Sequence, residues 1–191
     1  MVFSSELFLY GFMPIFFSLY YLIADRRKNW LILIASLIFY GIGAGSTVLV
    51  LLVSIVVNQF LALRIEPATP VRRKALLAIG VAINLFGLGY YRYGPFLWQL
   101  AGGAIGALGL HPLPAAPAIP LPIGISFFTF QAISYLIDVY RHEISCAGSY
   151  GEFATYHSLF SQLIAGSIVR YREIKLLSAN SFDPFIIYFR F

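Results

Sequence analysis

The stretch LPIGISFFTFQAISYLIDVY, residues 121–140, decides the fold class of this chain. Pro122 opens it and Gly124 follows, so we expect the backbone to turn and to enter a helix whose first turn needs no amide hydrogen from the proline. The next sixteen residues are almost all apolar. At about 1.5 Å per residue they cross, together with Leu121 and Pro122, most of a hydrocarbon layer roughly 30 Å thick. The stretch therefore predicts a membrane-spanning helix.

One side of this predicted helix is polar. At about 100° per residue, a single narrow arc holds Phe127, Gln131, Ser134 and Asp138. A carboxylate and an amide are costly to expose to lipid, so this stripe should face protein or a wet cavity. Two interpretations stay open. Either the polar groups hydrogen-bond to neighbouring helices, with Asp138 reaching interfacial water or Arg141, or the stripe lines a passage for a polar substrate or an acyl donor.

The composition indicates an integral membrane protein. Hydrophobic residues make up 60% of the 191 residues and charged residues 11%, and the mean hydropathy is +0.82. Charged residues are about 25% of a soluble globular domain, so a soluble fold is excluded. The net charge of +5 comes from clusters between apolar runs, which is typical of topology signals. No RNA- or DNA-binding motif is present, so we do not expect nucleic acid as a partner. The expected partner is the lipid bilayer.

Cysteine chemistry is limited to Cys146, which lies in a short polar loop. A single cysteine forms no internal disulfide and no cysteine-based metal site, so we interpret it as an inert surface thiol. The sequence has no phosphate-binding loop, dinucleotide fingerprint or HExxH motif. We therefore expect neither a metal site nor a cofactor.

Successive apolar runs predict an all-α, polytopic membrane helical bundle with about six spans and one weak or re-entrant segment. The weak segment is the glycine-rich run 96–110, and the proline-rich run 111–122 is expected to be a stiff extended linker. Pro14 should kink the first span. The predicted spans are residues 7–23, 30–44, 47–63, 75–89, 121–140 and 153–169.

Polar residues inside these runs are few. Asn58, in the third span, is interpreted as a hydrogen-bonding contact between helices, with a ligand contact as the alternative. Residues 64–74 hold two prolines and several charges, which predicts a polar loop before the fourth span.

The basic residues orient the predicted spans. Basic residues concentrate on the cytoplasmic side of membrane proteins. With the N-terminus outside, all the basic residues that flank the spans except Arg92 lie in the cytoplasm, so this orientation is the predicted one. Those placed in the cytoplasm are Arg26, Arg27, Lys28, Arg64, Arg72, Arg73, Lys74 and Arg141.

Two stretches resemble a known family. LPIGISFFTFQAISYLIDVYR at 121–141 and LFSQLIAGSIVRY at 159–171 are similar to motifs in the front half of the membrane-bound O-acyltransferases, in the bacterial alginate O-acetylation branch. MVFSSELFLYGFMPIFF and RKNWLILIASLIFYG resemble the start of the same proteins. The family usually has proline where this chain has Ser161 and Ser167, which changes the local backbone path.

The resemblance divides the chain in two. Residues 1–175 are expected to form the N-terminal part of a membrane O-acyltransferase domain, and 176–191 a divergent tail of the kind that a truncation or frameshift leaves. The resemblance implies a multi-pass protein of the bacterial inner (cytoplasmic) membrane. It also implies transfer of acetyl groups toward a periplasmic polysaccharide such as alginate, with periplasmic polysaccharide-acetylation proteins as partners and an unidentified acyl donor.

The resemblance adds site candidates as well. In this family the segment that 159–171 resembles packs near the substrate passage. The passage candidates are therefore Gln131, Ser134, Asp138, Gln162, Gly166 and Arg170. The catalytic histidine of the family lies on a later membrane segment that is not among these residues, so no catalytic residue is assigned.

Acyl transfer to a hydroxyl needs a general base, for which histidine is the usual choice. His111 and His142 lie in polar segments and are interpreted as surface residues. His157 is next to an apolar run, and we interpret it as an interfacial residue that opens or caps the last helix. Two other functions remain open: a non-catalytic membrane scaffold or transporter-like module, and a nonfunctional truncated remnant.

Overall fold

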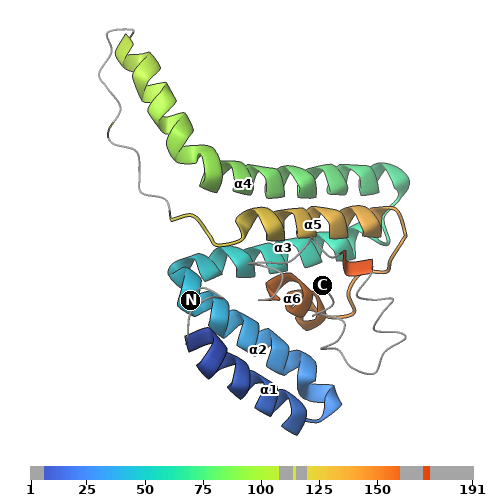
Figure 1. Cartoon of the computed structure of the whole chain (residues 1–191). Helices are drawn as coiled ribbons and strands as arrows, with labels where there is room; N and C mark the ends of the chain where they lie inside the picture. The colour runs from blue at the N-terminus through green and yellow to red at the C-terminus, as the bar shows by residue number, and fades with distance from the viewer. Residues whose placement is uncertain (1–6, 108–113, 115–119, 160–169, 173–191) are drawn as a thin grey trace.

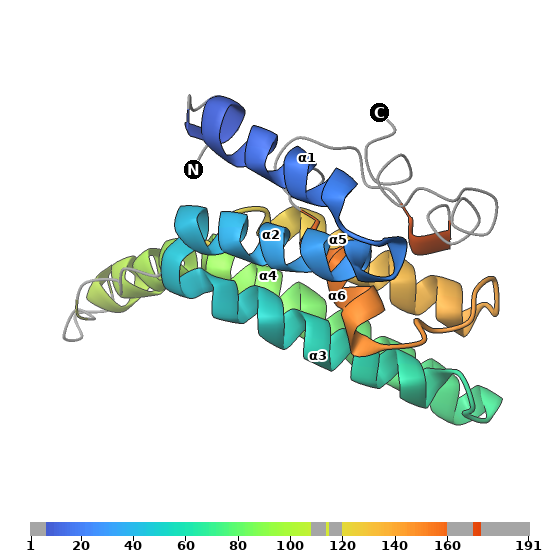
Figure 2. The same ribbon diagram turned by 90° about the horizontal axis from the view of Figure 1, so that it is seen from below.

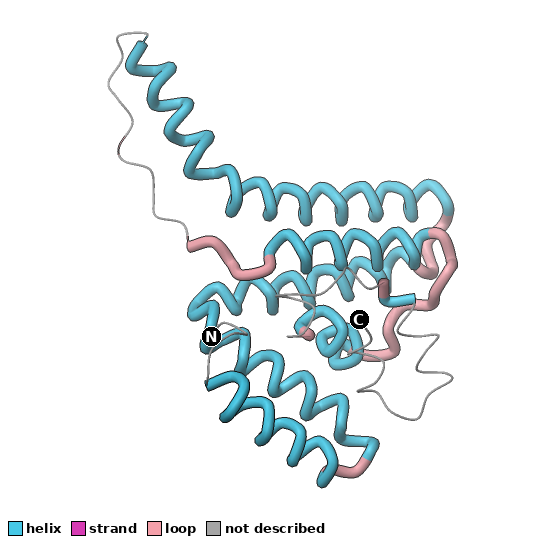
Figure 3. The backbone as a smooth tube through the Cα atoms, in the orientation of Figure 1, coloured by secondary structure: helices cyan, strands magenta, loops and turns pink. Residues whose placement is uncertain are grey.

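The structure is a computed structural model of the whole chain that describes residues 7–107, 114, 120–159 and 170–172. Every regular element in this part of the chain is helical, so the prediction of an all-α fold is confirmed (Figures 1 and 3). The elements are a π-helical turn η1 (Leu7–Phe12), α1 (Met13–Leu22), α2 (Asp25–Ala44), a 3-10 turn η2 (Gly45–Thr47), α3 (Val48–Ile65), α4 (Pro70–Ala107), α5 (Ile125–Tyr140) and α6 (Tyr150–Ser158).

Helices α1 and α2 form a first hairpin with a small apolar core of its own. Phe16 and Tyr20 of α1 pack with Ile32 and Phe39 of α2. Pro14 lies inside one helical run, just after the point where the π-helical η1 passes into α1, so the helical geometry changes next to the proline. A kink of the first span at Pro14 stays a prediction.

The chain reverses between α2 and α3 at Gly45, whose φ of 57° and ψ of −132° are strained for any residue with a Cβ. The two helices then diverge, and the short helix α6 packs against both of them, as Figures 1 and 2 show from two sides. Ser149 caps α6 by accepting a hydrogen bond from the amide of Glu152 at 3.1 Å.

Helix α4 corrects two predictions. The expected fourth span and the weak segment that follows it are one continuous helix, and Pro95 lies inside it. Figure 1 shows this helix bent, and an internal proline accounts for a bend because it removes one hydrogen bond and displaces the preceding turn. The polar loop expected at 64–74 is shorter in the structure and comprises residues 66–69. Helix α4 begins at Pro70, because proline is well suited to the first turn of a helix.

Helix α5 is the centre of the bundle and packs against α3, α4 and α6. It begins at Ile125 and not at Pro122, because Gly124 adopts a left-handed φ of 71° and the Pro122 carbonyl accepts from the amide of Ile125 in a turn. Its apolar side, with Phe128 and Leu136, forms the main core together with residues of α3 and α6.

Among the described residues, two helical runs are long and apolar enough to cross a membrane, namely Arg27–Ile65, which includes the turn at Gly45, and Pro70–Ala107. Tyr10–Leu22 and Ile125–Tyr140 are shorter apolar helices. The six expected spans are therefore shown only in part. Much of the predicted linker at 111–122 and of the last predicted span at 153–169 lies outside the described residues.

Candidate functional site

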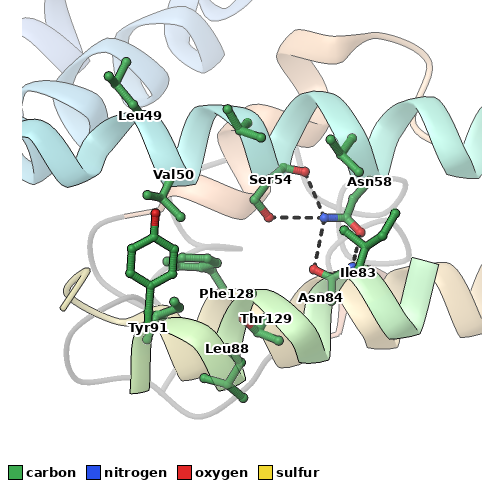
Figure 4. Close-up of a pocket in the computed structure, with 14 residues that line it drawn as sticks. Leu49, Val50, Ser54, Asn58, Ile83, Asn84, Leu88, Tyr91, Phe128 and Thr129 are labelled. Carbon is green, nitrogen blue, oxygen red and sulfur yellow. Dashed lines mark hydrogen bonds between the residues drawn. The ribbon is translucent and has the colours of Figure 1, made fainter. Parts of the chain in front are cut away.

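The interior of the bundle holds a cluster of polar side chains from three helices. Ser54 and Asn58 come from α3, Asn84 from α4 and His157 from α6, and all four are close enough to form one hydrogen-bonded chain. Figure 4 shows the first three of these side chains. Ser54 and Asn58 are four residues apart, so they lie on the same face of α3. This shared face brings their side chains together at the centre of the helix.

Asn58 and Asn84 join α3 to α4 by a reciprocal pair of hydrogen bonds. Asn84 Nδ2 donates to Asn58 Oδ1 at 2.7 Å, and Asn58 Nδ2 donates to Asn84 Oδ1 at 3.3 Å. Each amide also donates to a carbonyl of its own helix, Ser54 for Asn58 and Gly80 for Asn84, both at 2.8 Å. The interpretation of Asn58 as a contact between helices is therefore confirmed.

His157 is fully buried, with an exposed fraction of 0%. Its Nε2 lies 3.0 Å from Ser54 Oγ, its ring stacks on Phe153 at 5.1 Å between centroids, and Phe128 meets it edge-on at 5.8 Å. The prediction of an interfacial histidine is therefore wrong. The sequence did not indicate this because the ring is buried by α3 and α5, which are distant in sequence.

A cavity of about 380 Å³ opens beside the polar cluster. Residues of α3, α4 and α5 surround it, and most of its wall is apolar. Figure 4 shows Ser54, Asn58 and Asn84 on one side of this cavity and Phe128 with Thr129 on another. The full lining is Leu49, Val50, Val53, Ser54, Val57, Asn58, Ile83, Asn84, Gly87, Leu88, Tyr91, Ile125, Phe128 and Thr129.

The polar stripe of α5 faces protein at two of its positions, as expected. Gln131 and Asp138 have exposed fractions of 3% and 2%, whereas Ser134 is half-buried and Phe127 is 39% exposed. The stripe is on the side of α5 opposite to Ile125, Phe128 and Thr129, which line the cavity. At about 100° per residue the two sides are roughly half a turn apart. A passage along the stripe stays a prediction, and the cavity is not that passage.

Asp138 is surrounded by charged residues at the end of α5. Its Oδ2 is buried and has no hydrogen-bond partner. The charges that act on it are those of Arg141, Glu143, Arg170 and Arg172, and Arg172 Nη1 donates to Glu143 Oε2 at 2.9 Å. Arg170, an exposed member of the second motif, is thus one of the charges that act on Asp138. Gln162 and Gly166 lie outside the described residues.

A second hydrogen-bonded network ties the loop after α5 to α3. Tyr135 Oη donates to Gln59 Oε1 at 2.9 Å and accepts from the amide of Ala147 at 2.8 Å, while Gln59 Nε2 donates to the Ala147 carbonyl at 2.9 Å. Sequence reasoning missed this network. The signal available was the amide of Gln59 inside an apolar run, next to Asn58.

The same loop corrects the interpretation of Cys146 as a surface thiol. The side chain is half-buried, and its Sγ donates to Glu66 Oε2 at 2.7 Å while its amide donates to Glu66 Oε1 at 3.2 Å. Of the other histidines, His142 is exposed as expected and contacts Arg73, and His111 lies outside the described residues. In the described part of the chain, no group of three or more His, Cys, Asp or Glu side chains is placed to hold a metal ion.

The fold and the site define a helical bundle with long apolar helices, a polar interior cluster and a cavity beside it. The chain is 40% identical over 177 residues to "Probable alginate O-acetylase AlgI" of Pseudomonas aeruginosa, covering 91% of this chain and 34% of that protein. The protein of the same name from Azotobacter vinelandii is 38% identical over 184 residues, with coverages of 91% and 35%. "Peptidoglycan O-acetyltransferase" of Helicobacter pylori is 31% identical over 212 residues, with coverages of 91% and 38%.

The chain is therefore homologous to the alginate O-acetylases, and the resemblance to this branch of the membrane-bound O-acyltransferases is confirmed. It spans about a third of the length of the curated relatives it matches. The homology and the two long apolar helical runs together indicate a membrane protein. No family model and no solved structure matches the chain.

Proposed function

We propose that this chain is the N-terminal part of a membrane O-acyltransferase of the bacterial inner membrane that passes acetyl groups toward a periplasmic polysaccharide such as alginate. The observation that supports this most directly is the identity of 40% over 177 residues with an alginate O-acetylase. Periplasmic polysaccharide-acetylation proteins are the proposed partners, because the acetyl group must reach an acceptor outside the membrane.

The interior of the bundle is compatible with this function. The most family-like stretch, 121–141, forms α5 at the centre of the bundle. Polar side chains are buried there at a cost, and in membrane helices such groups mark either contacts between helices or the path of a polar substrate. In this chain the Asn58–Asn84 pair takes the first role. Asp138, with an unpaired buried oxygen, is a candidate for the second.

The arrangement of the helix ends supports the proposed orientation. Arg73 Nε donates to the carbonyl of Ile65, its Nη2 donates to the carbonyls of Glu66 and Ala68, and it also contacts His142. The end of α3, the start of α4 and the end of α5 therefore lie together. The basic residues of 64–74 and Arg141 thus share one end of the bundle, which is proposed to be the cytoplasmic end.

The function is tested with a chimera in which residues 1–175 replace the matching segment of the P. aeruginosa relative. In a strain deleted for that relative, the chimera should restore O-acetyl groups on alginate, measured by NMR of the polysaccharide. The 191-residue chain expressed alone should restore none, since no catalytic residue of the family is assigned in it. A chimera that is inserted in the membrane in normal amounts but restores no acetylation would contradict the proposal.

The orientation has its own test. In a Cys146→Ser background, Thr69→Cys should be shielded from a membrane-impermeant thiol reagent in intact spheroplasts, and Ala116→Cys should react. The reason is the excess of basic residues on the side assigned to the cytoplasm. The reverse labelling pattern would contradict the proposed orientation.

Two alternatives are kept because the chain spans about a third of its relatives. The first is a non-catalytic membrane scaffold or transporter-like module, and the second is a nonfunctional truncated remnant. A scaffold would retain binding to the periplasmic acetylation proteins in a pull-down while the chimera stays inactive. A remnant would show neither binding nor activity. The peptidoglycan O-acetyltransferase at 31% identity makes peptidoglycan the second acceptor to assay with the chimera.

A further inference from the structure

The cavity beside the polar cluster runs along the helices for about the thickness of one membrane leaflet. Its lining on α3 extends from Leu49 to Asn58, and its lining on α4 extends from Ile83 to Tyr91. At about 1.5 Å per residue these stretches are about 12–14 Å long, and half of a hydrocarbon layer of roughly 30 Å is about 15 Å. The cavity therefore has the length of the hydrocarbon region of one leaflet.

The two ends of the cavity lie at different depths. Helix α4 begins at Pro70, and its length from there to Tyr91 is about 31 Å, enough to cross the whole hydrocarbon layer. Tyr91 is thus placed at the membrane surface, where tyrosines concentrate. Asn84 lies about 10 Å closer to the centre of the layer and pairs with Asn58 at the other end of the cavity. The cavity therefore extends from the membrane surface toward the middle of the bilayer.

The cavity opens outward between α3 and α4. Val53 of α3 and Ile83 of α4 line it and are at the same time exposed. Its floor is formed by α5, where Phe128 and Thr129 also line it but are buried. In a membrane, exposed apolar side chains of such helices contact lipid tails. The opening between Val53 and Ile83 therefore faces hydrocarbon.

The size of the cavity limits what it can hold. Its volume is about 380 Å³. One turn of an α-helix needs more, about 420 Å³ for a cylinder about 10 Å wide and about 5.4 Å high. A further membrane helix therefore does not fit inside. A single alkyl chain does, because it is much thinner than a helix and as long as one leaflet is thick.

Water is a poor occupant of this space. Asn58 and Asn84 use their amide hydrogens on each other, on Ser54 and on carbonyl groups of their own helices. The rest of the wall is mostly apolar. A buried water needs about two to four polar partners, whereas apolar cavities stay dry or take up apolar molecules. The lining therefore favours an apolar ligand.

We propose that this cavity binds one acyl chain of a membrane phospholipid. The chain enters between Val53 and Ile83, with its ester end next to Tyr91 and its methyl end next to Asn58. Figure 4 shows the Tyr91 ring reaching from α4 toward Val50 of α3, so a hydroxyl donor lies at the end of the cavity where the ester carbonyl is placed. The bound chain fills the space between three helices and keeps water away from the amide pair.

Binding of a lipid at this site is independent of the acyl-transfer step. The cavity lies at the end of the bundle opposite to Arg73, whose contacts with the Ile65 carbonyl and with His142 join the other ends of α3, α4 and α5. With that other end in the cytoplasm, as proposed above, the bound chain comes from the periplasmic leaflet. Only this choice of leaflet rests on the proposed orientation.

The test is photo-crosslinking with a phosphatidylglycerol that carries a diazirine in the middle of one acyl chain. The full chain and the chimera described above are each reconstituted in vesicles that contain this lipid, illuminated and analysed by mass spectrometry at residue level. We expect label on Phe128 and Thr129, which are buried and form the cavity floor. Phe86, which is 77% exposed on α4, is the internal reference for ordinary contact with lipid.

Gly87→Phe is the variant that blocks the cavity. Gly87 lines it, and a Cβ at this position meets no heavy atom of the described chain within 4 Å, so the added ring has room there. The label on Phe128 and Thr129 should fall by at least about tenfold, because a ring and an acyl chain cannot share closely packed space. Gly89→Phe is the matched control, since Gly89 also has open space at its Cβ but lies outside the cavity lining. It should label like the original chain, and Phe86 should be labelled in all three proteins.

The direction of the chain is tested with two further phospholipids, which carry the diazirine near the ester or near the methyl end. The first should label Val50 and Tyr91, and the second should label Val57 and Ile83. The reverse gradient would overturn the placement of the ester end next to Tyr91.

Two outcomes would overturn the lipid site itself. One is the absence of label from Phe128 and Thr129 in folded proteins whose Phe86 is labelled, and the other is undiminished label in folded Gly87→Phe. Size-exclusion profiles in detergent establish that each variant is folded. A photoreactive free fatty acid that labels the floor when the phospholipid does not would overturn the choice of phospholipid.

The chimera separates this site from the proposed function. Label in the full chain but not in the chimera would show that a later segment of the relative fills the cavity, which would overturn the lipid site in the complete protein. Acetylation of alginate by the chimera remains the measure of the proposed function. Because the label and the acetylation are measured independently, either one can fail while the other stands.

Discussion

The two parts of α4, before and after Pro95, differ in what they contact although they belong to one helix. The first part packs against α3 and α5, and the buried positions of α4 are Gly80 and Asn84. The part after Pro95 extends away from the bundle in Figure 1, and Phe96, Leu97 and Leu100 are 62%, 56% and 60% exposed. The fully buried positions of α4 are thus small or polar, and its larger apolar side chains are either partly buried against the core, as Leu76 and Leu88 are, or exposed.

This pattern is what a membrane environment favours. Lipid is as apolar as leucine, so apolar side chains gain little by leaving it for a helix interface. Close packing and hydrogen bonds decide which face turns inward. Helix α3 follows this only in part: Asn58 and Gln59 are buried and Leu49 and Val53 are exposed, but its inner face also holds apolar residues such as Leu51 and Ile55. The comparison teaches that Asn58, Gln59 and Asn84 mark the packed faces of α3 and α4, whereas leucine occurs both inside, as at Leu51 and Leu61, and outside, as at Leu49 and Leu97.

The largest expected effect comes from filling the close contact at Gly80. A Cβ at this position would lie 2.7 Å from Leu136 Cδ1 and 3.2 Å from Leu61 Cδ1, so Gly80→Val forces these side chains apart. Overpacking of this kind costs about 1–3 kcal/mol in the free energy of unfolding. Gly103→Val is the matched control after Pro95, because a Cβ there meets no atom within 4 Å. Thermal midpoints from fluorescence-detected size-exclusion should fall for the first variant only, and equal midpoints would contradict the comparison.

The next effect is expected at the amide pair. Asn84→Leu removes the two hydrogen bonds to Asn58 and the one to the Gly80 carbonyl, and it leaves the Asn58 amide without its partner on α4. The cost should be about 1–2 kcal/mol, since hydrogen bonds between membrane helices are weak and a buried unpaired amide adds its desolvation. Phe86→Leu, at a 77% exposed position of the same helix, is the control. A thermal midpoint that is unchanged by Asn84→Leu would show that the pair does not hold α3 and α4 together.

A smaller change is expected for the network that fixes the loop after α5. Tyr135→Phe keeps the ring stacked on Phe153 at 4.5 Å but removes the hydroxyl shared by Gln59 and the amide of Ala147. The expected loss is about 1 kcal/mol. Hydrogen–deuterium exchange should also increase at 144–149, where the hydroxyl holds the backbone. Tyr150→Phe, at an exposed tyrosine, is the control, and equal exchange in both variants would contradict the role of the hydroxyl.

The smallest change in stability is expected at Asp138. Asp138→Leu removes a buried oxygen that has no hydrogen-bond partner, so the free energy of unfolding should change by less than about 1 kcal/mol. If the α5 stripe lines a substrate passage, acetylation by the chimera should nevertheless fall several-fold compared with Ile137→Leu. Equal acetylation by the two variants would leave the stripe without a role in function.

Sequence reasoning predicted the helical class, the positions of most apolar helices and the inward face of α5 at Gln131 and Asp138. These follow from local properties, namely apolar run length and the angle of about 100° between successive residues. It failed at the part of α4 around Pro95, where a proline and several glycines suggested a break. The helix continues because a bend accommodates the proline ring, and the backbone stays helical on both sides of Pro95.

The candidate site was less predictable than the fold. Asn58 was singled out as a polar residue inside a span, but its partner Asn84 and the contact of Ser54 with His157 join residues that are 26 and 103 positions apart. Helical periodicity relates residues of the same helix, so it does not predict pairs that join two helices. His157 was placed at an interface because its neighbours in sequence are polar as well as apolar. Its burial depends on α3 and α5 closing over it.

The sequence by itself determined that this chain is a bundle of apolar helices with a family-like central helix, because composition and helical periodicity act within each segment. The tertiary structure decided which polar side chains meet, that α4 is one bent helix, and that Ser54 faces both a cavity and a buried imidazole. These features depend on the packing of helices that are distant in the chain, where close contacts such as Gly80 against Leu136 set the spacing.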